Sequence, residues 1–561
     1  MMAHRILSLA AAMVLAPLAL TPIAPAQNVT QQDLLKPLGE SWYSHSGDYT
    51  ARRYSSLTAV NRLTVKNLTP AWTAKMTQGE NPVALTGYSR VRPGSNTGGE
   101  SPTGFNSSGG SIKATMLEVD GILYASMPDN VWAVDARSGE TLWHYYWKAR
   151  GGTHIASRGV GLWHDYLFFE TPDNYLVSLD AKTGKERWHR EIAKVEGGYF
   201  STPAPMIVKD HVLAGTGNDI DAPAFLKSYD PETGDLQWTF YVTPQKEGDP
   251  GLDTWKSLDA ARHGGGNIWM PGAYDPQTNL YITGTGNPTP SWQTGQRGDG
   301  DNLYTCSLVA LDVDTGKLKW YFSTSPHDTH DYDSSQVPVL VDGIFNGRPR
   351  KMALTASRNG YFFVVDRITG EHLLTSKYGQ TTNWAEGLTP HGGPKTNPEK
   401  DAAIGGTLIS PNSGGTVNWQ PPAYSPQTGL LYQYAADTFS MAYLTDPDPR
   451  GSMGLGGKDE LSIGTNGSYL IGIDYKTGKA RWRHKLYTQG FGGGGLLATA
   501  GGLVFSGDGA GNLAAFDAAT GKALWGARIG NVSNPPQTYM LDGKQYILAA
   551  VGDTLYSFLL Y

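Results

Sequence analysis

One phrase recurs along the 561-residue chain and constrains its fold more than any other feature. It consists of an apolar residue, Asp, two variable residues, Ser or Thr, Gly, three variable residues and Trp. Six copies keep the same Asp-to-Trp interval: Asp135 to Trp143, Asp180 to Trp188, Asp230 to Trp238, Asp312 to Trp320, Asp474 to Trp482 and Asp517 to Trp525. A seventh copy begins at Asp366 and has Leu374 at the tryptophan position. This regularity predicts a fold built from one repeated unit.

Each copy predicts a β-hairpin. Asp can cap a tight turn, Gly can take the positive φ that ends it, and alternating apolar residues flank both. A further strand pair precedes many copies, as in 121–125 and 131–134 before Asp135. The unit therefore has about four strands. Tryptophan at one fixed offset from a turn favours a wedge between sheets over a stacking platform for a ligand.

Four-stranded sheets packed around an axis cover one another's faces and protect their edges. We therefore predict an all-β chain that forms an eight-bladed β-propeller of four-stranded sheets with docked tryptophans. The two widest gaps between copies leave room for a degenerate unit, and 423–429 falls in the longer one. Pro70-Ala71-Trp72 begins an N-terminal unit. The count is eight or nine, and we choose eight, with the terminal strands closing the ring.

The first 26 residues are typical of an export signal. His4 and Arg5 precede an apolar run over 6–20, and small residues at 24–26 precede a cleavage point. A membrane anchor is the alternative, but the run is shorter than the roughly 20 residues that span a bilayer. We expect a signal peptide at 1–26, a single mature domain at 27–561, and a periplasmic location.

Charge and cysteine content exclude several classes of protein. The 45 basic and 51 acidic residues leave a net charge of −6, which excludes a basic nucleic-acid-binding protein. No second long apolar stretch follows the first, so we expect no membrane span. Cys306 is the only cysteine, so no intrachain disulfide can form and packing must stabilise the chain.

Polar side chains gather in the segment 327–333, directly after Trp320. Asp331 and Asp333 would point the same way in an extended chain, so both could face one cation. Asn287 in a glycine-rich turn and Asp219 at a similar strand end add two more oxygen ligands. An all-oxygen set suits a hard cation rather than zinc. The alternative is a solvated acidic turn, together with Asx turns at the other two positions.

In combination, these and other motifs resemble the periplasmic PQQ-dependent alcohol dehydrogenases, the quinoprotein family that includes methanol dehydrogenase. The likeness runs from about Trp42 to the C-terminus. It is carried by the residues 47–49 with 53–55, 158–160, 264–269, 286–288, 326–333, 357–360, 418–421 and 497–502. The resemblance implies an eight-bladed propeller with PQQ and a metal ion bound near its axis.

The resemblance also implies roles for individual residues. Trp269 would stack on the flat quinone, and Asn418 and Trp419 would approach it from the far side. The remaining cofactor contacts would come from Lys113, Arg158, Thr202 and Thr216. The metal ligands would be Asp219, Asn287, Asp331 and Asp333. Asp331 would also be the general base, and Arg358 would hydrogen-bond the reactive carbonyl. The alternatives are a core position for Trp269, a structural ion pair for Arg358 and a turn cap for Thr202.

Three positions bear on which metal binds and how open the site is. Asp333 resembles the extra carboxylate of the lanthanide-using members, so a lanthanide is favoured over calcium. Asp219 aligns with a metal-binding glutamate of the family and is one methylene shorter. The adjacent cysteines that cover the quinone in the family are absent, and Gly151-Gly152-Thr153-His154 occupies their place.

The implied activity is oxidation of a primary alcohol, polyol or sugar alcohol to the carbonyl, by hydride transfer to metal-bound PQQ. The chain contains no Cys-x-x-Cys-His, so we expect electrons to pass to a separate soluble acceptor such as a cytochrome c. A homodimer is left open. The alternative function is a propeller without cofactor that acts as a scaffold or ligand-binding protein.

Overall fold

The computed structural model describes residues 28–76, 78–79, 95–104, 110–445, 458–488 and 490–561. The predicted signal peptide lies outside these residues. The described chain is all-β, as predicted, apart from two short helices, α1 (Gln31–Leu34) and α2 (Leu258–Arg262). Five single 3₁₀ turns are present: Val65–Asn67, Val195–Gly197, Leu252–Thr254, Thr294–Gln296 and Pro398–Lys400. No described helix is long and apolar enough to cross a membrane.

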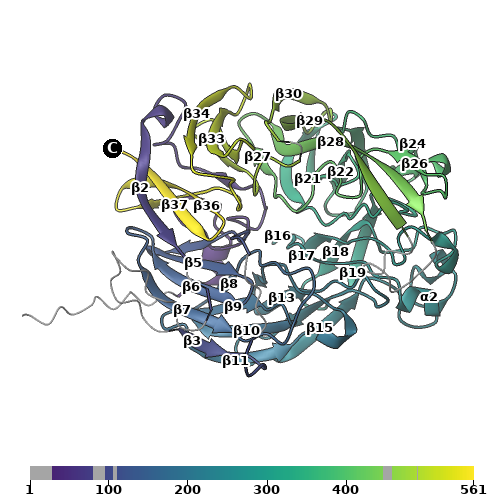
Figure 1. Cartoon of the computed structure of the whole chain (residues 1–561), viewed down its shortest axis with the longest axis horizontal. Coiled ribbons are helices and arrows are strands. Elements are labelled where there is room, and N and C mark those ends of the chain that lie inside the picture. Colours follow the sequence, from purple (N-terminus) through teal and green to yellow (C-terminus); the bar gives the residue numbers. More distant parts are fainter. Residues whose placement is uncertain (1–27, 77, 80–94, 105–109, 446–457, 489) are drawn as a thin grey trace, which may run out of the picture.

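Sheets in the first part of the chain are formed by strands that are consecutive in sequence, and Figure 1 shows them side by side around a common centre. The first contains β3 (Asn96–Gly98), β4 (Leu117–Val119), β5 (Ile122–Met127), β6 (Asn130–Asp135) and β7 (Thr141–Trp147). The second contains β8 (Gly161–Trp163), β9 (Tyr166–Glu170), β10 (Tyr175–Asp180) and β11 (Glu186–Glu191). The third contains β12 (Met206–Val208), β13 (His211–Gly215), β14 (Phe225–Tyr229) and β15 (Leu236–Tyr241).

Later sheets follow the same plan. The fourth contains β16 (Ala273–Asp275), β17 (Leu280–Gly284), β18 (Ser307–Asp312) and β19 (Leu318–Ser323). The fifth contains β20 (Val339–Phe345), β21 (Arg348–Ala356), β22 (Tyr361–Asp366) and β23 (His372–Lys377). A small two-stranded sheet, β24 (Ala385–Leu388) and β25 (Pro394–Thr396), follows. The sixth large sheet contains β26 (Thr407–Ile409), β27 (Ala423–Ser425), β28 (Leu430–Leu444), β29 (Lys458–Asp474) and β30 (Ala480–Lys485).

The two ends of the chain meet in the last two large sheets. One contains β31 (Leu497–Thr499), β32 (Leu503–Gly507), β33 (Asn512–Asp517) and β34 (Ala523–Arg528), with β1 (Tyr54–Ser55) added in parallel. The other contains β35 (Gln537–Leu541), β36 (Lys544–Val551) and β37 (Thr554–Leu560). N-terminal β2 (Leu68–Lys75) completes it by antiparallel pairing with β37, with Leu68 opposite Leu560. Pairing of the termini joins the first and last parts of the chain, as predicted.

The wide gaps between repeat copies contain insertions rather than extra units, which corrects one prediction. The turn at 423–429 connects β27 with β28, and these strands belong to the same sheet as the Asp474 copy. The longest gap also contains β24, β25 and the extended hairpin of β28 and β29. The other wide gap contains α2 and irregular loops between the third and fourth sheets. A turn signal identifies a hairpin but does not say which strands of a sheet it joins.

The repeated tryptophans lie between neighbouring sheets. Trp143 of β7 donates its indole N–H to the carbonyl of Ala181, the residue after Asp180 in the next copy, at 3.0 Å. A Cβ on Gly184, which has φ +67°, would come within 2.5 Å of the Trp143 ring. Only glycine therefore fits beneath the indole. The same indole-to-carbonyl bond joins Trp72 to Ala136, Trp238 to Val313, Trp320 to Arg367 and Trp482 to Ala518.

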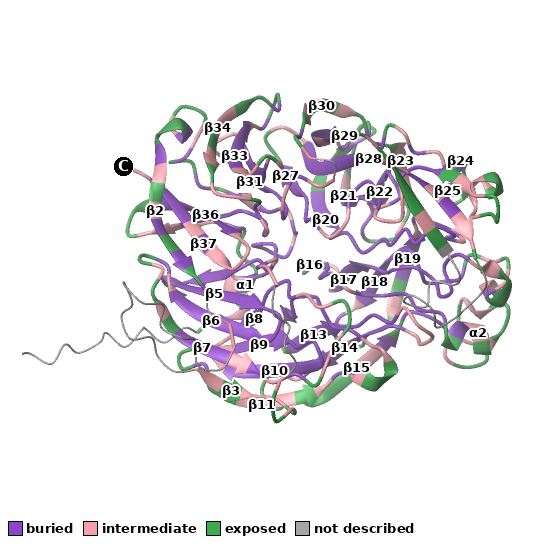
Figure 2. Ribbon diagram, in the orientation of Figure 1, coloured by how far each residue is buried: buried purple, intermediate pink, exposed green. Residues whose placement is uncertain are grey.

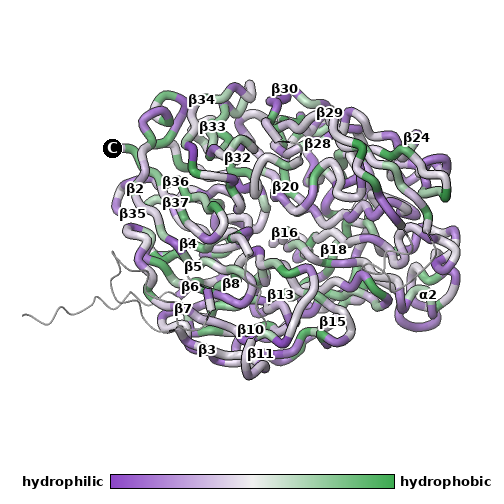
Figure 3. The backbone as a smooth tube through the Cα atoms, in the orientation of Figure 1, coloured by the Kyte–Doolittle hydropathy of each residue, from purple (hydrophilic) through white to green (hydrophobic). Residues whose placement is uncertain are grey.

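The hydrophobic core lies in the spaces between sheets. One buried cluster joins Leu354 of β21, Leu431 of β28 and Phe516 of β33, which belong to three sheets. Figure 2 shows the inner strands mostly buried and outer strands such as β11 and β15 partly exposed. Figure 3 shows the matching change in hydropathy, with apolar residues along β5 and polar residues along β11. Each sheet therefore buries both faces and exposes its outer edge.

Candidate active site

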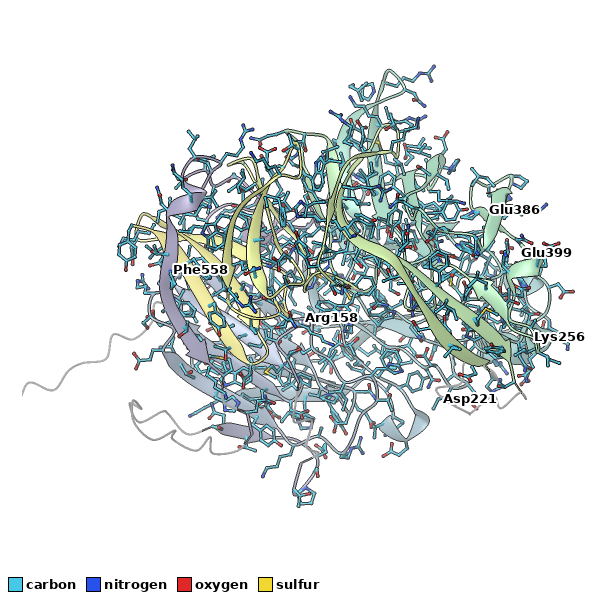
Figure 4. The ribbon with its side chains drawn as sticks, turned by 45° about the horizontal axis from the view of Figure 1, so that its top comes forward. Arg158, Asp221, Lys256, Glu386, Glu399 and Phe558 are labelled. Atoms are coloured by element: carbon cyan, nitrogen blue, oxygen red, sulfur yellow. The ribbon has the colours of Figure 1, made fainter. Side chains whose placement is uncertain are left out.

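A cavity of about 390 Å³ brings together residues from loops far apart in the sequence. It is lined by Lys113, His154, Ile155, Ala156, Arg158, Phe200, Thr202, Asp219, Asn267, Trp269, Asn287, Asp331, Asp333, Arg358, Asn418 and Trp419. Every predicted site residue except Thr216 is in this lining. Figure 4 labels Arg158 near the middle of the molecule, while Glu386 and Glu399 lie at its periphery.

The loops converge because they occupy equivalent places in successive sheets. Asp219, Asn287 and Arg358 lie between the second and third strands of their sheets, after β13, β17 and β21. Arg158 and Thr202 precede the first strand of theirs, β8 and β12. In an antiparallel hairpin the first strand begins at the end where the second strand finishes. Both kinds of loop therefore lie at one end of the ring of sheets.

Carboxylates line one part of the cavity around Arg358. The guanidinium donates from Nη1 to Oδ2 of Asp333 at 2.6 Å and from Nη2 to Oδ2 of Asp331 at 3.3 Å. Asp333 also accepts from the indole of Trp269 at 2.9 Å and from the backbone N–H of Asn287 at 2.7 Å. Burial raises the pKa of Asp333, although Arg358 opposes the change. Burial would lower the pKa of Arg358, but Asp331 and Asp333 hold it above its ordinary value.

The backbone turns sharply before the two aspartates. Asp331 has φ +65°, in the left-handed region, and the carboxylate of Asp328 accepts hydrogen bonds from the backbone N–H groups of His330, Asp331 and Tyr332. This segment is therefore a capped turn and not the extended strand assumed from the sequence. Asp331 and Asp333 still reach the same guanidinium, so both carboxylates face the same part of the cavity.

Cations line another part of the cavity. Arg158 is 6% exposed, and its guanidinium carbon lies 4.9 Å from the centre of the Trp269 ring. It donates from Nη1 to the carbonyl of Thr202 at 3.2 Å, while its Nε is buried with no hydrogen-bond partner in the described chain. Burial lowers the pKa of Arg158 to about 9. Burial and the nearby Arg158 also lower the pKa of Lys113, whose ammonium lies 5.7 Å from the ring centre of Trp419.

Asp219 is held from two sides. Nδ2 of Asn267 donates to its Oδ1, and Nε2 of His154 lies 3.2 Å from its Oδ2. The hydrogen bond to Asp219 raises the pKa of His154. Nδ2 of Asn267 also lies 3.3 Å from Oδ1 of Asn287, so one amide contacts two predicted metal ligands. Among the described residues, no three His, Cys, Asp or Glu side chains are grouped closely enough to hold a metal ion.

Thr202 and Thr216 have different surroundings. Thr202 lines the cavity and donates its hydroxyl to the carbonyl of Trp269 at 3.1 Å. Thr216 is fully buried outside the lining, and its hydroxyl bonds to the carbonyl of Phe225 at 3.3 Å. The structure therefore brings Thr202 to the site and uses Thr216 within its own sheet.

Sequence reasoning did not assign roles to several residues that hold the site together. Asn267 belongs to the glycine-rich motif at 264–269, which was a detectable signal. The carboxylate of Glu460, on β29, accepts from the backbone N–H of Ser413 at 3.0 Å, and the carbonyl of Ser413 accepts from Nε of Arg358 at 2.7 Å. No local pattern marks Glu460, because its contact depends on how the long hairpin folds back over the 412–416 loop.

Comparison with known proteins identifies the family. The profile described as "Glucose/ethanol/alcohol dehydrogenase, beta-propeller domain" matches residues 42–380. A quinohemoprotein alcohol dehydrogenase from Comamonas testosteroni is 33% identical, with 91% of this chain and 72% of the relative covered. This chain belongs to the PQQ-dependent alcohol dehydrogenase family. The family consists of quinoproteins that act on CH–OH donors.

Other relatives of this quinoprotein agree. The quinoprotein alcohol dehydrogenase PedH from Pseudomonas putida is 33% identical, with 89% of this chain and 84% of the relative covered. The crystal structure of the Comamonas testosteroni quinohemoprotein has a TM-score of 0.81 at 29% identity and covers 96% of this chain and 83% of its own. A europium-containing methanol dehydrogenase has a TM-score of 0.79 at 26% identity and covers 94% of this chain and all of its own. A further profile, of the outer membrane protein assembly factor BamB, matches residues 466–558 of this quinoprotein.

Proposed function

We propose that this protein is a periplasmic quinoprotein dehydrogenase that oxidises a primary alcohol, polyol or sugar alcohol to the carbonyl, using PQQ and one metal ion. The observation that carries this proposal is the division of charge in the cavity. In the lining, Lys113 lies near Arg158, whereas Asp219, Asp331 and Asp333 lie near Arg358. The proposal includes a signal peptide at 1–26 and one eight-bladed propeller at 27–561.

The cationic part of the cavity fits the carboxylate groups of PQQ. Arg158 is buried, and neither it nor Lys113 forms an ion pair within the described chain, so burial lowers the pKa of both. A buried cation without a counter-charge is unfavourable unless a ligand supplies one. Trp269 adds an indole against which a planar ring could lie, and Asp333 fixes it through the indole N–H.

The acidic part fits a hard cation by the chemistry of its donors. Asp219, Asn287, Asp331 and Asp333 supply carboxylate and amide oxygens to one cavity. Such oxygens are the ligands preferred by Ca²⁺ and other hard ions. The additional negative charge of Asp333 supports a trivalent lanthanide over calcium, because charge at the site raises affinity for higher-valent ions. The europium-containing relative binds an ion of this class.

The residues of the chain then have distinct tasks. When bound, the quinone would accept the electrons, with its carbonyl polarised by the cation. Asp331 would accept the proton of the alcohol hydroxyl, and Arg358 would donate hydrogen bonds where negative charge develops. Lys113, Arg158, Thr202, Trp269, Asn418 and Trp419 would orient the ring. Electrons would then pass to a separate soluble acceptor, such as a cytochrome c.

Reconstitution tests the proposal. We expect purified protein mixed with PQQ and either La³⁺ or Ca²⁺ to show the absorbance of bound quinone. We also expect it to reduce an artificial dye when a panel of alcohols is supplied. Failure to bind quinone with either ion would contradict the proposal and favour a scaffold without cofactor.

Asp333 tests the choice of metal. Asp333→Ala removes a carboxylate that contacts Trp269, Asn287 and Arg358. We expect dye reduction to fall more with La³⁺ than with Ca²⁺, because the trivalent ion depends more on the extra charge. Asp314→Ala, which changes an exposed aspartate paired with Lys209, is the control. Equal loss with both ions would reject a selective role for Asp333.

A further inference from the structure

His154 contacts a predicted metal ligand of the site. Its Nε2 lies 3.2 Å from Oδ2 of Asp219, whose side chain is 12% exposed. Oδ1 of the same carboxylate accepts from Nδ2 of Asn267. Both oxygens of Asp219 are therefore engaged within the protein. A cation that uses Asp219 must share or replace one of these hydrogen bonds.

Of the two donors, His154 has fewer restraints. Asn267 is 2% exposed, and its Oδ1 also accepts from the backbone N–H of Asn218 at 2.8 Å. The His154 side chain is 33% exposed, and its ring lies with its centre 4.6 Å from that of Phe200. Rotation of His154 away from Asp219 breaks fewer contacts than movement of Asn267. The bond to Oδ2 is therefore the one that a cation would displace.

The loop that carries His154 has little other polar attachment. Residues 151–156 belong to no helix or strand, and within the described chain they make no backbone hydrogen bond. The loop is fixed at its ends, where the backbone N–H of Arg150 donates to Asp173 at 2.9 Å and the Ser157 hydroxyl bonds to Ser126 at 2.8 Å. Between these ends, the loop contacts the cavity wall through the polar pair of His154 and Asp219. It also has φ +47°, so the backbone is bent at this residue.

We propose that His154 sets the cation affinity of the site by competing with the ion for Asp219, and that cation binding releases the loop at 151–156. The inference rests on the proposed function, because it assumes that Asp219 is a ligand. An N–H donor on a ligand oxygen occupies a lone pair and directs its positive end toward the site, and both effects oppose a cation. One oxygen of Asp219 cannot accept the hydrogen bond from His154 and coordinate the ion at full strength at the same time. Binding of the ion and attachment of the loop are therefore linked.

Calorimetric titration of the full-length apoprotein with La³⁺ alone tests the competition. We expect His154→Ala to bind La³⁺ about tenfold more tightly than the unchanged protein, the effect of losing one charge-assisted hydrogen bond from the competing state. His154→Gln keeps an N–H donor and should bind with affinity between the two. Thr153→Ala, an exposed change in the same loop, is the matched control and should leave the affinity unchanged.

Hydrogen exchange supplies a second measurement that does not depend on activity. In the unchanged protein, La³⁺ should speed exchange of the Arg150 amide, which donates to Asp173 at the end of the loop. In His154→Ala, exchange there should be fast before any ion is added. Equal or weaker La³⁺ binding by His154→Ala would overturn the proposal, since it would make His154 a ligand or a purely structural residue. Absence of La³⁺ binding by both the unchanged protein and His154→Ala would also overturn the proposal. Absorbance of bound PQQ in the same samples tests the proposed function separately.

Discussion

Arg158 offers a prediction in which stability and ligand binding change in opposite directions. Burial lowers the pKa of Arg158 from 12.5 to about 9, which corresponds to about 5 kcal/mol of unfavourable free energy for the charged guanidinium. The folded-state pKa lies below that of the unfolded chain, so this cost is fully present at pH 7, below both values. Arg158→Met removes the charge and keeps most of the aliphatic side chain. The exchange should therefore relieve the cost of burying the charge.

Against this gain, the variant loses two contacts. The hydrogen bond to the Thr202 carbonyl contributes about 1 kcal/mol, and the contact with the Trp269 ring contributes a similar amount. The net effect on the apoprotein is a stabilisation of about 3 kcal/mol. In a chain of this size, we expect the melting temperature of the apoprotein to rise by a few degrees.

The same substitution should weaken PQQ binding, because it removes a charge-assisted contact to a carboxylate. Such a contact contributes about 1.5 to 3 kcal/mol, which corresponds to a loss of affinity of roughly 10- to 150-fold. Thermal unfolding of the apoprotein and titration of PQQ by absorbance measure the two effects. A lower melting temperature together with unchanged PQQ affinity would refute the reasoning and make Arg158 a structural residue.

Arg53 is the matched control. Burial also lowers its pKa to about 9, but it donates to the carbonyls of Leu496, His45 and Pro536 and to the hydroxyl of Thr115. Arg53→Met would leave these buried acceptors without their donor, so we expect a lower melting temperature. Equal responses of the two arginine variants would show that hydrogen bonding does not distinguish their roles.

Three other residues test the contacts described above. Glu460→Ala should lower kcat about tenfold with little change in KM, because Ser413 then holds Arg358 less firmly. Glu460→Gln should restore most of the rate. An unchanged kcat in Glu460→Ala would exclude a positioning role. Burial raises the pKa of Glu118 to about 7 from an ordinary 4.5, so the native state keeps a proton that the unfolded chain loses in this window. Urea unfolding should show that the free energy of unfolding falls by about 3 kcal/mol as the pH rises from 4.5 to 7. The same fall in Glu118→Gln would contradict this account. Trp320→Ala should destabilise the protein by about 3 to 5 kcal/mol, and a melting temperature like that of the unchanged protein would show that the tryptophan wedges do not join the sheets.

The repeat could be interpreted from the sequence because its physical basis is local. Asp and Gly at fixed offsets define a turn, and Trp at a fixed offset packs against the turn of the neighbouring sheet. The contact of Trp143 with Gly184 is an example. The turn at 423–429 was placed in a separate unit because a local signal does not identify the strands that flank it in space. The pairing of β28 with both β27 and β29 decides that question.

The candidate site divides in the same way. Residue type and motif determined which side chains could carry chemistry, including Trp269, Asp331 and Arg358. Only the tertiary structure decided which of them line one cavity and that Thr216 bonds within its own sheet. It also decided that His154 contacts Asp219 and that Glu460 accepts from Ser413. The physical reason is that a turn depends on a few consecutive residues, whereas burial, charge pairing and shared hydrogen bonds depend on loops that several sheets, arranged around a common centre, bring together.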